Sequence, residues 1–123
     1  MKRYDLLFLS LSALALTTGV SMGVFMAATH DFALMPVHAH LNLLGWTSLA
    51  LFGLVHRSYP ALAGQRLSAV HAGLAMPSAL LLPAGIWLAM VADNPALAIL
   101  ASLMWLAGCL VFLFQVLGLR KAT

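Results

Sequence analysis

Two histidines, His38 and His40, stand two residues apart in a strongly apolar stretch of the chain. On a regular helix this spacing turns the two side chains about 200° apart, so they point to nearly opposite faces. They do not readily hold one ion together, but each can serve a different site. Neutral imidazole is a good ligand for haem iron and for copper. The pair therefore predicts a metal or haem site; the alternative is that both rings form hydrogen bonds with polar groups at the membrane surface.

The helix face that carries His38 continues through a stripe of four further residues, Asn42, Gly45, Leu49 and Gly53. The two glycines remove side-chain bulk from this face. The missing bulk leaves room either for a flat cofactor or for the close approach of another helix, and the sequence does not separate the two. We expect Asn42 and Gly45 to belong to the cofactor site of the histidine pair.

The other histidines give weaker signals. His56 returns to the face of His38 about 27 Å further along the helix, too far to share a ligand. His71 can approach His56 in an antiparallel helix pair, which makes a second metal or haem site an alternative there. The favoured interpretation is that both are interfacial histidines bonded to loop carbonyls or water, and that His30 is solvated. Three methionines are soft donors for copper, the less favoured metal: Met22, Met26 and Met76.

The composition places these residues in a membrane protein. Hydrophobic residues make up 63% of the 123 residues and charged residues only 7%, against about 25% charged in a soluble domain. The net charge of +3 is carried by small basic groups beside apolar runs, which argues for membrane topology and against a nucleic-acid partner. The single cysteine, Cys109, excludes an internal disulfide and a cysteine-based metal motif.

Four apolar runs are long enough to cross a bilayer as helices, which needs about 20 residues each. They form one all-α domain over residues 1–123, and we expect the helices at about 6–28, 37–56, 67–91 and 96–119. Pro36 and Pro95 stand where helices begin, because proline fits the first helical turn. Asp93, Asn94 and Pro95 predict a tight turn.

The basic residues predict the orientation. All six lie before the first run, in the second connection or after the fourth run: Lys2, Arg3, Arg57, Arg66, Arg120 and Lys121. By the positive-inside rule both termini face the cytoplasm, as in a multi-pass protein of the bacterial inner membrane. The alternative that the first run is a cleaved signal peptide is disfavoured by its length and its poor cleavage pattern.

The stretch from His38 to Trp46, His-Ala-His-Leu-Asn-Leu-Leu-Gly-Trp, resembles the haem–copper oxidase subunit I superfamily, with cbb3-type oxidases, nitric oxide reductases and NnrS-like haem proteins as its nearest likeness. In that superfamily a His-x-His near the outer end of one helix binds different haems on its two faces. The resemblance implies that His38 and His40 ligate the iron of haem b, that the helices form one four-helix unit of a twelve-helix core, and that electron transfer is the task.

The chain also departs from the family pattern. It has one third of the family's helices, no second chelating histidine pair, and no tyrosine or carboxylate within the apolar runs, so we do not expect a complete oxidase. The family geometry instead suggests a homotrimer that rebuilds the twelve-helix core. Each haem would take His38 from one chain and His40 from the next, because identical contacts close in a ring.

The expected function is thus a bis-histidine membrane cytochrome for electron transfer or small-gas sensing, with a quinone or a respiratory-chain protein as a possible redox partner. Two alternatives stay open. One is a copper- or haem-handling factor that serves assembly of a respiratory oxidase. The other is a structural subunit without a cofactor.

Overall fold

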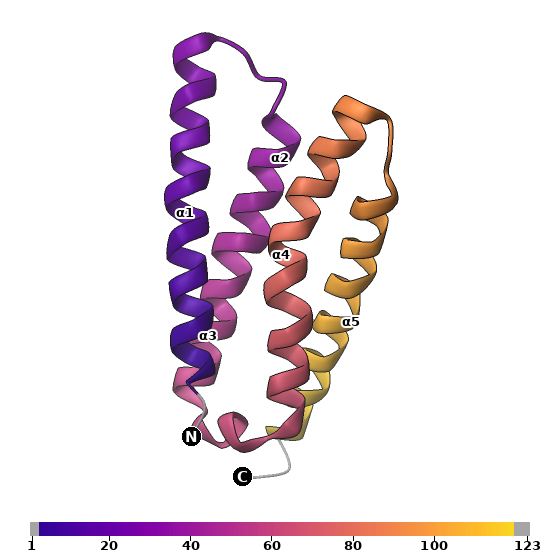
Figure 1. Cartoon of the computed structure of the whole chain (residues 1–123). Helices are drawn as coiled ribbons and strands as arrows, with labels where there is room; N and C mark the ends of the chain where they lie inside the picture. The colour runs from indigo at the N-terminus through magenta and orange to yellow at the C-terminus, as the bar shows by residue number, and fades with distance from the viewer. Residues whose placement is uncertain (1–2, 120–123) are drawn as a thin grey trace.

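The computed structural model describes residues 3–119, and the chain is all-helical with four helices (Figure 1). The first is α1 (Tyr4–Thr29). The second is continuous over residues 35–58 and is made of α2 (Met35–His40), a π-helical segment (Leu41–Ser48) and α3 (Leu49–Ser58). A short 3-10 helix (Pro60–Gly64) leads to α4 (Arg66–Ala92), and α5 (Ala96–Leu119) ends the described chain. The predicted set of four helices is confirmed.

Three of these helices, α1, α4 and α5, are long and apolar enough to cross a membrane, which is the signature of a membrane protein. The second helix has the length of a span, but its regular α-helical hydrogen bonding is interrupted by the π-helical segment. Within residues 3–119, every connection between the long helices is short. This arrangement suits lipid, because the backbone polar groups are satisfied inside each helix.

Local chemistry ends the helices at the two turns away from the termini. His30 and Asp93 follow α1 and α4 in the left-handed conformation, with φ of 53° and 51°. Asn94 Oδ1 then accepts a hydrogen bond from the Ala96 amide at 3.1 Å, which closes the turn predicted there. Pro36 lies in the first turn of α2, as expected.

The two ends of the bundle differ in charge. The start of α1, the 58–66 connection and the end of α5 lie at one end, while the turns that follow α1 and α4 lie at the other (Figure 1). We call these the arginine end, after Arg3, Arg57 and Arg66, and the far end. Lys2, Arg120 and Lys121, which also entered the topology prediction, lie outside the described residues.

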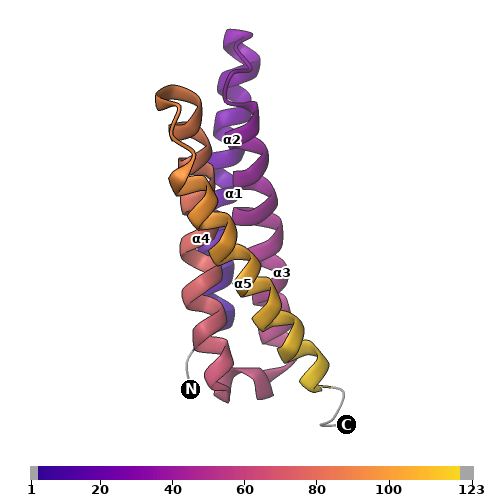
Figure 2. The ribbon, with the colours of Figure 1, turned by 90° about the vertical axis from the view of Figure 1, so that its right-hand side faces the viewer.

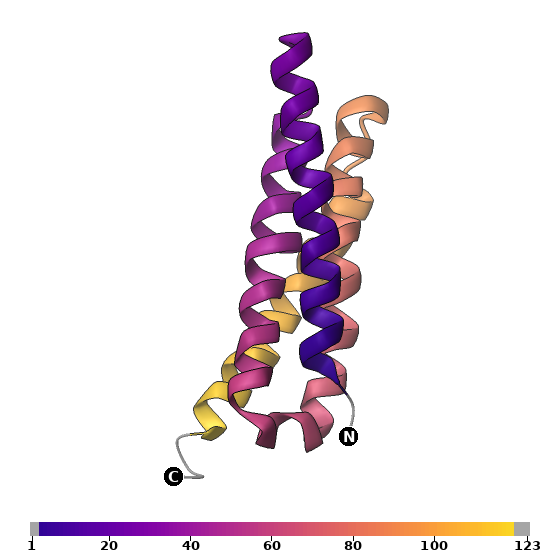
Figure 3. The ribbon, with the colours of Figure 1, turned by 90° about the vertical axis from the view of Figure 1, so that its left-hand side faces the viewer.

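Helix packing divides the molecule into two pairs. The first pair is α1 with the second helix, and the other is α4 with α5. α4 joins the pairs, since it also contacts α1 and the second helix. α5 crosses the others obliquely (Figures 2 and 3).

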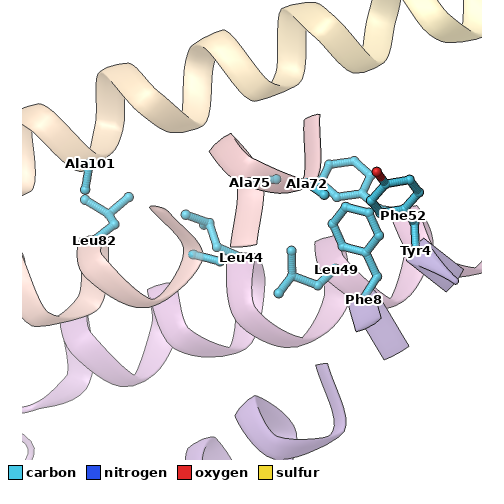
Figure 4. Packing of buried hydrophobic residues seen from close by; sticks show 10 residues of the cluster. Tyr4, Phe8, Leu44, Leu49, Phe52, Ala72, Ala75, Leu82 and Ala101 are labelled. Atoms are coloured by element: carbon cyan, nitrogen blue, oxygen red, sulfur yellow. The ribbon is translucent and has the colours of Figure 1, made fainter. Parts of the chain in front are cut away.

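The core changes in character along the bundle axis. Large aromatic residues, Tyr4, Phe8 and Phe52, gather toward the arginine end, whereas Leu82 and Ala101 pack toward the far end (Figure 4). The α4–α5 contact at the far end is especially close. A Cβ on Gly85 would lie 2.5 Å from the Ala98 backbone nitrogen.

We predict that Gly85→Ala destabilises the bundle, because the added methyl group would clash with the backbone of α5 at Ala98, which cannot rotate away as a side chain can. Overpacking of this kind costs about 1–3 kcal/mol of unfolding free energy. The matched control is Gly73→Ala in the same helix, where a Cβ meets nothing within 4 Å. The measurement is denaturant unfolding of the detergent-solubilised protein followed by circular dichroism. Equal stability of the two variants would contradict the close contact.

Candidate functional site

His38 lies half-buried on α2 against a glycine of α1. A Cβ on Gly23 would be 3.1 Å from His38 Cε1, so the missing side chain is what makes room for the ring. One turn further on, Asn42 lies against Gly19 in the same way, since a Cβ there would be 2.5 Å from Asn42 Oδ1. The small-residue pair of the first helix therefore accommodates the two polar side chains of the second.

Asn42 is hydrogen-bonded to His38, which lies one turn earlier in the helix. Its Nδ2 donates to the His38 carbonyl oxygen at 2.9 Å and lies 3.3 Å from His38 Nδ1. An amide nitrogen can only donate, so His38 Nδ1 is the acceptor and the ring proton belongs on Nε2. Asn42 thus fixes both the position and the tautomer of His38.

His40 has the opposite arrangement. Its Nδ1 lies 2.8 Å from the carbonyl oxygen of Pro36, one turn earlier in the helix. A carbonyl only accepts, so Nδ1 carries the proton and Nε2 is left with a free lone pair. The ring is half-exposed and lies on the opposite side of the helix from His38. Hydrogen bonding of one ring nitrogen to a carbonyl is how proteins orient histidines that bind metals.

The glycines of the predicted stripe let α1 approach the second helix. A Cβ on Gly45 would lie 2.9 Å from the Ala15 methyl group, and one on Gly53 would lie 2.8 Å from Leu9 Cγ. The sequence left two explanations open for these glycines, a flat cofactor or close helix approach. Within this chain they allow close helix approach, and a flat cofactor does not fit between these two helices. A part for Asn42 and Gly45 in a site shared with another chain stays a prediction.

The π-helical segment begins directly after His40 and contains Asn42 and Gly45. Ser48 Oγ donates to the Leu43 carbonyl oxygen at 2.8 Å, which ties the end of the segment to a residue five positions earlier. π-Helical turns occur frequently at functional sites. The sequence analysis did not anticipate this segment.

A second histidine pair lies toward the arginine end. His56 and His71 come from α3 and α4, and their ring centroids are 5.9 Å apart with planes only 11° from parallel. Both are buried, with 3% and 0% of their surface exposed. The approach of the two residues is as expected, and both are buried within the bundle.

The hydrogen bonds of this pair also differ from the expectation. His56 Nδ1 donates to the Phe52 carbonyl oxygen of its own helix at 2.9 Å, and not to a loop carbonyl. His56 Nε2 and both ring nitrogens of His71 have no hydrogen-bond partner among residues 3–119. Loop carbonyls among residues 3–119 therefore do not bond these ring nitrogens, whereas bonding to water, the other part of that interpretation, stays a prediction.

Aromatic rings surround this pair. Phe8 lies with its centroid 5.3 Å from His56 and 5.2 Å from His71. Phe52 and Phe112 lie 4.6 Å and 5.2 Å from His71. α1, α3 and α5 thus each contribute a ring to one aromatic cage around two imidazoles.

Gln115 is a further buried polar residue toward the arginine end. The sequence analysis did not single it out. Its Nε2 donates to Ser68 Oγ at 2.7 Å, and Ser68 Oγ donates to the Leu62 carbonyl oxygen at 2.6 Å. Gln115 Oε1 is buried with no partner among the described residues. The available signal was an amide in an otherwise apolar run, since polar side chains in membrane helices are usually placed for a reason.

An ion-pair cluster closes the arginine end. Asp5 accepts hydrogen bonds from Arg3 at 3.0 Å and from Arg57 at 3.3 Å, which links α1 to the end of α3. Hydrogen bonding and charge from Asp5 raise the pKa of Arg3. Asp5 is therefore committed to arginines and is not a free donor for the nearby histidines.

The remaining candidates stand apart from both pairs. His30 is exposed and caps α1, in keeping with a solvated residue. Within residues 3–119 no three side chains among histidine, cysteine, aspartate and glutamate come together as a metal-binding group. Any ion held by the described residues would thus have at most two such ligands.

Comparison with protein-family models, with curated proteins and with solved structures found no match. The resemblance to the haem–copper oxidase superfamily rests on residues 38–46 alone and stays a hypothesis.

We predict that the two histidines of α2 hold opposite tautomers in the protein without added haem. His40 is protonated on Nδ1 and His38 on Nε2, because Pro36 accepts from one ring and Asn42 donates to the other. Nitrogen-15 correlation spectra of histidine-labelled protein distinguish the two forms. In Asn42→Leu the preference of His38 for Nε2–H should be lost while that of His40 is unchanged. The same tautomer at both positions would contradict this assignment.

Proposed function

We propose that the protein is a membrane haem b-binding protein in which His38 and His40 ligate iron between neighbouring copies of the chain, for electron transfer or small-gas sensing. The observation that carries the proposal is the hydrogen bond from His40 Nδ1 to Pro36, which leaves Nε2 of a half-exposed imidazole ready to bind a metal. Haem iron accepts this kind of ligand.

The interior of a single chain does not suit the haem. Ala15 fills the space beside Gly45, and α1 backs the ring of His38. The His40 ring lies on the other side of the helix, so one chain cannot place both rings on one iron. A haem that uses both residues fits only between chains, which is why the proposal includes an oligomer.

His38 needs a change of tautomer to serve as an Nε2 ligand. Its proton must then lie on Nδ1, and a partner must accept it. Asn42 can do this when its side-chain amide turns over, because the turn exchanges the nitrogen and the oxygen. The turn gives up the hydrogen bond from Asn42 Nδ2 to the His38 carbonyl oxygen. Asn42 is then a positioning residue for His38, in line with the expectation that it belongs to the site.

Symmetry favours a trimer among the possible oligomers. The contact would join the His38 face of one chain to the His40 face of the next, and such unlike surfaces close naturally into a ring. Three four-helix units would rebuild the twelve-helix core that the resemblance implies. A haem held by His38 and His40 would have no open site on its iron, which would favour electron transfer over reaction with oxygen.

The site would lie on the outer side of a bacterial inner membrane. Arg3, Arg57 and Arg66 all lie at the arginine end, which the positive-inside rule assigns to the cytoplasm. His38 and His40 lie toward the far end and therefore face the periplasm. A quinone in the bilayer or a protein of the respiratory chain is the partner of matching chemistry.

We predict that His38→Ala and His40→Ala each abolish haem binding, because each removes one axial ligand. The measurement is the oxidised and dithionite-reduced visible spectrum of the detergent-purified protein. Wild type should show sharp α and β bands on reduction that change little with carbon monoxide. His30→Ala is the matched control and should keep the wild-type spectrum. Full haem content in His40→Ala would sink the shared-ligand arrangement.

A separate prediction concerns the number of chains. Haem-loaded protein should have the mass of three chains by native mass spectrometry or light scattering, and His40→Ala should dissociate in proportion to its loss of haem. A monomer with one haem per chain would overturn the intermolecular site.

A further inference from the structure

We infer that His56 and His71 form a second site, inside each chain, for one monovalent copper ion. The site is independent of the proposed haem. Its basis is the set of buried polar atoms that lack a hydrogen-bond partner among residues 3–119. There are four such atoms, three of them ring nitrogens of this pair: His56 Nε2, His71 Nδ1, His71 Nε2 and Gln115 Oε1.

Burial makes the free nitrogens costly. A neutral imidazole has one N–H donor and one lone pair, and His71 finds a partner for neither among the described residues. A buried polar group without a partner carries the cost of its lost hydration. Polar groups at membrane depth are usually placed for a function. A bound ion would use the lone pairs that the protein leaves free.

The geometry of the pair suits one ion with two nitrogen ligands. The two rings are nearly parallel, and their centroids are 5.9 Å apart. An imidazole lone pair lies in the plane of its ring, so rings at this separation would ligate one ion, about 2 Å from each nitrogen, once the side chains rotate to turn a nitrogen of each ring toward it. The hydrogen bond from His56 Nδ1 to Phe52 leaves His56 Nε2 as the nitrogen with the lone pair.

The small number of donors selects the ion. Zinc takes four ligands in structural sites and three protein ligands plus water in catalytic ones, whereas no third histidine, cysteine or carboxylate of the described residues joins this pair. Cuprous copper, unlike zinc, forms stable complexes with only two nitrogen ligands. Its single charge is also less costly to bury than the double charge of zinc, and the rings of Phe8, Phe52 and Phe112 lie around the pair.

Tyr4 contacts both the histidine pair and a surface hollow at the arginine end. Tyr4 packs edge-on against His56 at 6.1 Å between ring centroids. The same tyrosine lines a hollow of about 360 Å³ with residues of the 58–66 connection and the start of α4. Rotation of one aromatic side chain would therefore connect the histidine pair to the surface. A site of this kind suits the copper-handling alternative.

The test is copper binding by the full chain in detergent under argon. Copper is supplied with ascorbate as the reductant and a cuprous chelator as the competitor. We expect one copper per chain. X-ray absorption should show two nitrogen neighbours near 2 Å and the edge feature of two-coordinate cuprous copper.

His71→Phe and His56→Phe should each weaken binding by more than about 100-fold, since even changes outside the ligands cost about 10–100-fold. His30→Ala should bind as wild type does. Circular dichroism and gel filtration report folding, and His71→Gln, which keeps a polar side chain of similar length, replaces any phenylalanine variant that fails them.

Three outcomes would overturn the inference. The first is no copper retained by wild type against the chelator, which would leave the nitrogens to buried water. The second is undiminished binding in the His71 and His56 variants. The third is a spectrum with three or more ligands. The haem spectrum is recorded on the same samples, so failure of the copper site is seen separately from failure of the haem proposal.

Discussion

The close contact between α1 and the second helix is the constraint on which the rest of the structure depends. Inside lipid, apolar side chains gain little by exchanging lipid contacts for contacts with another helix. Helices therefore associate through tight packing and hydrogen bonds. Here the packing is made by glycines on both helices, which meet His38, Asn42, Ala15 and Leu9. Because α1 and the second helix approach so closely, the polar stripe of the second helix is turned inward along its length. α4 then packs across the pair, and α5 covers α4.

The surroundings of the second helix differ between its two ends. At the far end small glycines of α1 leave His38 only half-buried, and His40 on the other face remains half-exposed. At the arginine end large side chains replace the glycines, and Phe8 covers both His56 and His71. One pair is therefore open to a neighbouring molecule, whereas the other is enclosed within its own chain.

The two proposals follow from this difference. A haem is too large for the packed interior, so the open pair can use one only by sharing it with another chain. A single ion needs no such space, and the aromatic cage suits a small charge carried by soft, weakly hydrated copper. The ion pairs of Asp5 with Arg3 and Arg57 keep the fixed charges at the surface of the arginine end. Because the arginines are bound to Asp5, the imidazoles of His56 and His71 are the nitrogen ligands available behind Tyr4.

The helix number, the turn at Asn94 and the gathering of the arginines at one end followed from the sequence by itself. Each depends on local chemistry: the length of an apolar run, the fit of proline in a first turn, or the cost of charge in lipid. The opposite directions of His38 and His40 followed from helical periodicity alone. Tertiary structure decided which neighbour fills the space beside Gly45, why three ring nitrogens of His56 and His71 lack partners among residues 3–119, and that Gln115 bonds Ser68. Those facts depend on which side chains of separate helices meet, and periodicity within one helix carries no information about its neighbour.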